Sequence, residues 1–169
     1  MHIFSFSTLR RDEDGVATVE FALWVTGFFM IVMVALDFGM FFIERGKVNE
    51  AVAASAVASF EEADNVNFGV LPAYVRSIAD NQSIAVATSC NGVAGSCTNL
   101  NRTCACLKTD GSYVAAACGN ICTGPEVTGG STAGYYLTIE ATQGFNPVVL
   151  PAGMLADTSV TQQATVRLQ

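Results

Sequence analysis

Six cysteines lie close together in the C-terminal half of the chain, between positions 90 and 122. The residues between them are mainly glycine, asparagine, serine and threonine, so this segment has little apolar material from which to build a core. An even number of cysteines in a loop-rich stretch is typical of disulfide bonds formed in an oxidising compartment. The sequence therefore predicts disulfides, with the pairing left open, among Cys90, Cys97, Cys104, Cys106, Cys118 and Cys122.

Zinc binding is the alternative chemistry for four of these thiols. Cys104, Cys106, Cys118 and Cys122 would supply the four ligands of a tetrahedral site. However, the Cys-x-Cys gap is tighter than zinc ligands usually have, and the one histidine, His2, lies far away at the N-terminus. No Cys-x-x-Cys pair marks a redox-active site either. We therefore expect disulfides and no metal.

The rest of the sequence contains no recognisable catalytic arrangement. His2 lies in a short leader, so removal of that leader would leave no histidine for a Ser-His-Asp or Cys-His site. Gly129 and Gly130 are not followed by the lysine of a phosphate-binding loop. A net charge of −7 with only eight lysines and arginines argues against nucleic acid as a partner. We expect a protein that is not an enzyme and needs no cofactor.

A second group of functional residues stands at the start of a long apolar run. A charged leader ends in Gly15, and Val16 and three more small or apolar residues separate it from Glu20 and Phe21. A carboxylate at the mouth of a membrane helix is costly unless it has a partner. Cleavage after Gly15 would make Val16 the N-terminus and place Glu20 about one turn into the helix, where the helix dipole favours a negative charge. The new ammonium group of a neighbouring helix would also be a suitable partner.

One element positions these residues, an apolar segment that runs from Phe21 to Ile43 with Asp37 as its single charged residue. As a helix it would be about 34 Å long, enough to cross a hydrocarbon layer of about 30 Å. A buried core helix of a soluble domain is the alternative, but it would be unusually long and apolar on every side. A cleavable secretory signal would be shorter. We expect a single membrane pass, with Asp37 facing a partner helix or the lipid headgroups.

The sequence Gly-Val-Ala-Thr-Val-Glu-Phe-Ala-Leu at 15–23 resembles the start of a TadE-like pseudopilin, a minor pilin of the tight-adherence (Tad/Flp) type IV pilus system. The resemblance implies that a prepilin peptidase cuts between Gly15 and Val16, and that Glu20, followed by Phe21, acts in recognition and assembly. It also implies a role in pilus assembly and surface attachment. The implied partners are other pilins and pseudopilins, the prepilin peptidase and the Tad inner-membrane assembly proteins. The alternative is an uncleaved single-pass anchor that presents a disulfide-rich periplasmic interaction domain.

The chain divides into three parts on this reading: a cleaved leader at 1–15, a membrane and stalk helix at 16–63, and a periplasmic α+β domain at 64–169. The leader would lie in the cytoplasm and the anchor in the inner membrane, with the disulfide-rich domain in the periplasm or in the extracellular pilus. Apolar spacing predicts a helix near 71–78, and alternation predicts antiparallel strands at 83–89, 135–142 and 160–168. The apolar side of the stalk is expected to dock on the chain's own head domain through Val48, Val52, Val57 and Phe60.

Overall fold

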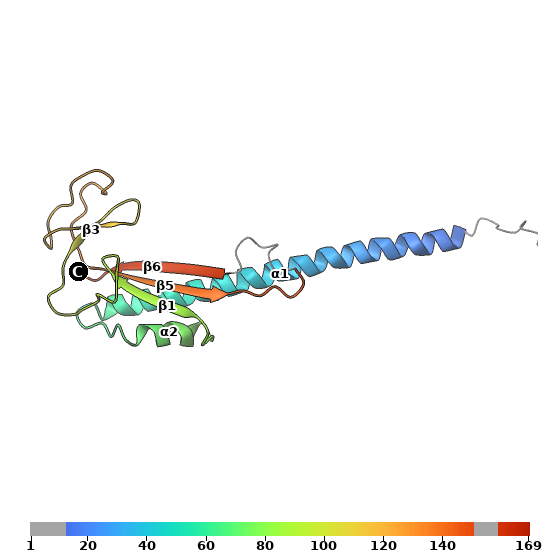
Figure 1. The fold of residues 1–169 in the computed structure, drawn as a ribbon, viewed down its shortest axis with the longest axis horizontal. Coiled ribbons are helices and arrows are strands. Elements are labelled where there is room, and N and C mark those ends of the chain that lie inside the picture. The colour runs from blue at the N-terminus through green and yellow to red at the C-terminus, as the bar shows by residue number, and fades with distance from the viewer. Residues whose placement is uncertain (1–12, 151–158) are drawn as a thin grey trace, which may run out of the picture.

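The protein is a long helix with a small head packed against its C-terminal half (Figure 1). The computed structural model describes residues 13–150 and 159–169. Helix α1 (Glu13–Glu61) is continuous over 49 residues, and the short helix α2 (Leu71–Ile78) follows it. Both lie where the sequence predicts helices. The leader falls outside the described residues except for the start of α1.

A four-stranded antiparallel sheet forms the centre of the head, and its strands run in the order β2-β1-β5-β6. A separate antiparallel pair joins β3 to β4. The strands are β1 (Ala85–Cys90), β2 (Val93–Ala94), β3 (Ala105–Leu107), β4 (Tyr113–Ala115), β5 (Tyr136–Gly144) and β6 (Ser159–Arg167). The three longest strands confirm the alternation in the sequence, whereas β2, β3 and β4 are too short to show a period. The expected α+β class is correct.

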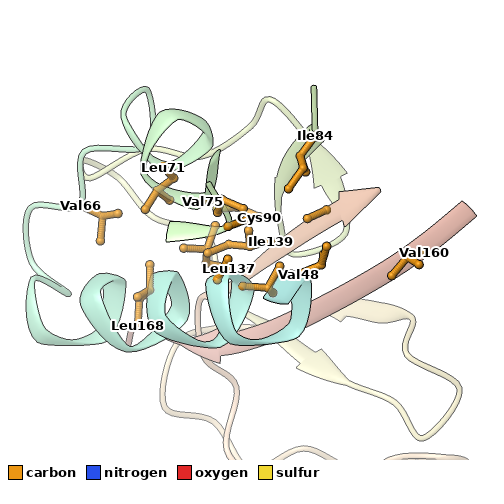
Figure 2. Packing of buried hydrophobic residues seen from close by; sticks show 14 of the residues in the cluster. Val48, Val66, Leu71, Val75, Ile84, Cys90, Leu137, Ile139, Val160 and Leu168 are labelled. Carbon is orange, nitrogen blue, oxygen red and sulfur yellow. The ribbon is translucent and has the colours of Figure 1, made fainter. Parts of the chain in front are cut away.

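Both helices cover one face of the four-stranded sheet, and the core lies between them and the sheet (Figure 2). Alternation along β5 buries Leu137 and Ile139 completely. They pack in one cluster with Val48 of α1 and Val75 of α2. The opposite face of β5 carries residues such as Glu140, which is exposed. The stalk therefore docks on the apolar face of its own head.

Only half of the predicted docking surface on the stalk is correct. Val48 and Val52 are buried, but Val57 and Phe60 are exposed. Val57 follows Val48 by nine residues, which is two and a half turns, so it lies on the opposite side of the helix. The docked face continues through Ser55 instead, whose hydroxyl donates a hydrogen bond to a carbonyl of its own helix.

The cysteine-rich segment contains three disulfide bonds, and the described residues include no free cysteine. The predicted disulfides are thus confirmed, and the four thiols of the zinc alternative bond to one another. Cys104 and Cys106 lie in a small cluster of their own, apart from the main core. The pairs are Cys90–Cys97, Cys104–Cys118 and Cys106–Cys122.

A loop of the cysteine-rich segment closes over the C-terminal end of α1. The Arg102 guanidinium donates a hydrogen bond to the carbonyl of Ala63, and it lies 5.2 Å from the ring centre of Tyr135. Asn99 accepts a hydrogen bond from the Val66 N–H at 3.1 Å and donates one to the Val66 carbonyl at 3.0 Å. The head is therefore fastened to the far end of the helix by polar groups as well as by the core.

Candidate functional site

The N-terminal half of α1 carries the predicted processing and assembly residues, and the rest of the described chain leaves it uncovered. No residue from Gly15 to Leu36 is buried. Large apolar side chains project outward all along it; Phe21 is 71% exposed and Trp24 is 74% exposed. In water such a surface would be strongly unfavourable. Among the described helices, α1 is the one long and apolar enough to cross a membrane.

The four predicted site residues Gly15, Val16, Glu20 and Phe21 lie within the first turns of α1. Val16 and Glu20 are four residues apart, so they share one face of the helix. Together with neighbouring apolar side chains they line a shallow surface. The Gly15–Val16 bond itself lies in the N-terminal part of α1 as described.

Glu20 is exposed and has no polar partner within the described chain. Neither of the two ion pairs found among residues 13–150 and 159–169 includes it, and no hydrogen bond is formed by its carboxylate there. The side chain projects from the same apolar surface as Phe21 and Trp24. A carboxylate so placed needs a partner from another molecule if the helix lies in a bilayer.

Asp37, the second carboxylate of the apolar run, lies in a different environment. It has no exposed surface. Its carboxylate accepts three backbone hydrogen bonds, from the N–H groups of Val148 at 2.9 Å, Val149 at 2.9 Å and Leu150 at 2.8 Å. The expectation that Asp37 faces a partner helix or headgroups is therefore wrong. The segment after β5 turns back along α1 and supplies the partner from within the chain.

Two further contacts tie the same part of the chain to α1. The rings of Phe41 and Phe145 meet edge to face with centres 5.4 Å apart. Gln143 donates a side-chain hydrogen bond to Glu44 at 3.0 Å. Asp37, Phe41 and Glu44 follow one another at i, i+4 and i+7, so all three lie on one face of the helix. This spacing is visible in the sequence, but the predicted docking surface began only at Val48.

Glu44 marks the point where α1 changes from apolar to charged. It accepts a hydrogen bond from the Lys47 ammonium group at 3.0 Å in addition to that from Gln143. Both bonds favour the ionised form. The Lys47 ammonium, and after it the Gln143 amide, therefore lower the pKa of the Glu44 carboxyl from its ordinary value.

The structure does not bring the two predicted groups of site residues together. Gly15, Val16, Glu20 and Phe21 lie near one end of the long axis, and the six cysteines lie around the other (Figure 1). Sequence reasoning missed the third group, Asp37 and its backbone donors, because those donors come from a segment more than a hundred positions later. Side-chain types give no sign of a bond made by backbone N–H groups.

Comparison with known proteins agrees with the sequence resemblance. No curated protein and no solved structure matches the chain. The family described as TadE-like protein matches residues 15–57. This range begins at the predicted cleavage site, includes Glu20, Phe21 and Asp37, and ends within α1 before the head begins. The N-terminal helix of the chain, about a quarter of its length, is therefore similar to the TadE-like family.

Proposed function

We propose that the protein is a minor pseudopilin of a Tad/Flp pilus, cut by a prepilin peptidase between Gly15 and Val16 and then assembled with other pilins through Glu20. The observation that carries this proposal is the position of Glu20. Its carboxylate lies on an apolar, exposed helix face, one turn beyond the cleavage site, and without a partner in the described chain.

A freed N-terminus on a neighbouring subunit is the partner that fits this position best. Cleavage turns the amide of Val16 into an ammonium group on the same helix face as Glu20. Between apolar helices the pair would be shielded from water, and removing one partner would leave an uncompensated charge at a cost of about 3–5 kcal/mol. Apolar contacts alone give helices in lipid little axial register, because lipid tails offer similar contacts. The ion pair would set the depth at which each subunit enters the bundle.

The disulfides support the orientation in this proposal. Three bonds within one small head are typical of an oxidising compartment, and they support a periplasmic head with a cytoplasmic leader. The Tad inner-membrane assembly proteins would then act on an anchor whose head already stands on the outer side. Phe21 would line the helix surface that meets the next subunit.

The experiment that tests the proposal replaces Glu20 in the producing strain. Glu20→Ala and Glu20→Gln should leave the protein anchored and oxidised but greatly reduce the number of surface pili. Glu50→Ala is the matched control, because Glu50 is an exposed carboxylate on the same helix but beyond the apolar run. Normal piliation in the Glu20 variants, with the protein present in the membrane, would falsify the assembly role.

Processing is tested separately by the mass of the protein recovered from cells. Removal of 15 residues with two basic and three acidic side chains from a chain of 169 residues and net charge −7 leaves 154 residues and a charge of −6. We expect Val16 as the N-terminal residue. An intact leader on protein that is incorporated into pili would contradict processing, and an intact leader without pili would favour the fixed anchor.

A further inference from the structure

The segment Phe145–Leu150 contacts α1 on the membrane side of the head (Figure 1). It follows β5 and runs along the helix away from the sheet. Its exposed side chains are those of Asn146, Val148 and Val149; Val148 is 77% exposed and Val149 is 41% exposed. We call this segment the membrane-side loop.

The charge pattern of α1 fixes the depth of this loop. Around the helix, Phe38, Phe42 and Ile43 are exposed and apolar, and the first charged residues after them are Glu44 and Arg45. Asp37 precedes Glu44 by seven residues, which is about 10 Å along the helix axis. Because the loop is bonded to Asp37, its tip lies about 10 Å on the apolar side of the charged boundary.

Hydrogen bonds between Asp37 and the loop backbone lower the energetic cost of this depth. Irregular backbone is unfavourable at membrane depth because its N–H groups lack water, and a carboxylate is unfavourable there for want of a partner. Here the Asp37 carboxylate accepts hydrogen bonds from the N–H groups of Val148, Val149 and Leu150. The carboxylate and the three N–H groups therefore all have hydrogen-bond partners. The side chains that the loop then exposes are two valines and the uncharged amide of Asn146.

We propose that the membrane-side loop, Phe145–Leu150, is a second membrane-contacting element, which lies in the outer interfacial layer of the bilayer and is positioned there by Asp37. Its partner is a lipid surface. The loop packs against α1 through Phe145, which is buried and whose ring meets that of Phe41. The inference rests on the anchoring of α1 in the membrane and is independent of cleavage and of pilus assembly.

The test measures the depth of a single tryptophan in liposomes. Trp24 is the only tryptophan in the chain, so Trp24→Phe gives a background into which Val148→Trp is introduced. The full chain is reconstituted in phosphatidylcholine liposomes whose acyl chains carry bromine at a shallow or a deep position. Leu100→Trp in the same background is the matched control, because Leu100 is 78% exposed and lies in the loop at the far end of α1. The unchanged chain, with Trp24, reports whether α1 is inserted.

Tryptophan at 148 should show blue-shifted emission and be quenched about twofold more by shallow bromine than by deep bromine, as expected for an interfacial residue. Tryptophan at 100 should show neither effect. Adding Asp37→Ala should reduce the quenching at 148 toward that at 100, while Trp24, tested in Asp37→Ala alone, remains quenched.

Four results would overturn the proposal. Quenching at 148 no greater than at 100, with Trp24 quenched, would show that the loop is in water although the helix is anchored. Blue-shifted emission at 148 without quenching by bromine would show that protein, such as a second copy, covers the loop. Full quenching at 148 in Asp37→Ala would show that Asp37 does not position it. If Trp24 itself is not quenched, the anchor fails and the proposal fails with it.

Discussion

Replacing Asp37 by alanine removes the acceptor of three backbone hydrogen bonds and tests how firmly they fasten the membrane-side loop to α1. A hydrogen bond to a charged group contributes about 1.5–3 kcal/mol. The cost of burying the charged carboxylate offsets part of the stabilisation from three such bonds. Alanine also favours the helix over aspartate by about 0.7 kcal/mol. The released N–H groups also recover water once the loop opens. We therefore expect a net loss of about 3 kcal/mol for closure of the loop.

Amide hydrogen exchange of the full chain in detergent micelles measures this loss directly. A change of about 3 kcal/mol corresponds to roughly 150-fold faster exchange at the three donor amides. The main core should keep its protection, because local opening need not unfold the rest. Asp110→Ala is the control: its carboxylate also accepts a backbone N–H, from Ser112 at 2.9 Å, but it is exposed. That variant should change exchange at Ser112 by less than about tenfold.

An exchange rate at Val148, Val149 and Leu150 within about threefold of wild type in Asp37→Ala would refute the reasoning. It would mean that the Phe41–Phe145 contact and the sheet keep the loop against α1 without the carboxylate. Equal effects of Asp37→Ala and Asp110→Ala at their respective donors would also refute it, since burial would then make no difference.

Three further predictions concern the head and its contacts with α1. Arg102→Ala should lower the free energy of unfolding by about 1–2 kcal/mol in urea titrations, because a hydrogen bond to a charged donor and a cation–π contact are lost together; a loss no larger than that in Arg102→Lys would argue against the ring contact. The pair Cys104→Ser and Cys118→Ser should cost up to about 3 kcal/mol of local stability, seen as faster exchange around β3 and β4, while β5 exchanges as before. Since the pKa of Glu44 is lowered by its hydrogen bonds, its contribution to stability is fully present above the ordinary glutamate pKa and is lost as the pH falls through the lowered value. Glu44→Gln should therefore lose less stability than wild type on acidification, and parallel pH curves would count against this.

The parts of the fold that follow a local period could be predicted from the sequence. The apolar run fixes α1, and alternation fixes β5 and β6 to within one or two residues. The even number of cysteines indicated disulfides, but not that Cys104 pairs with Cys118, because pairing depends on how the loops fold in space.

The environment of Asp37 could not be predicted in the same way. Its partners are backbone groups of a distant loop, and every residue type offers the same N–H group. By contrast, the roles of Gly15 and Glu20 come from their spacing and from the TadE-like match over 15–57, so they remain proposals about assembly.

Because the head is bonded to α1 at both ends of the docked face, the head and the helix move together as one rigid body. Arg102 closes over one end at Ala63, and the membrane-side loop is bonded at the other to Asp37. From Asp37 to Glu61 the helix extends about 36 Å, so a tilt of about 20° in the bilayer would swing the far end of the head by about 12 Å. Rotation of α1 about its own axis would turn the polar face of the sheet by the same angle. Forces that act only on the membrane-spanning part of the helix can therefore change the orientation of the head.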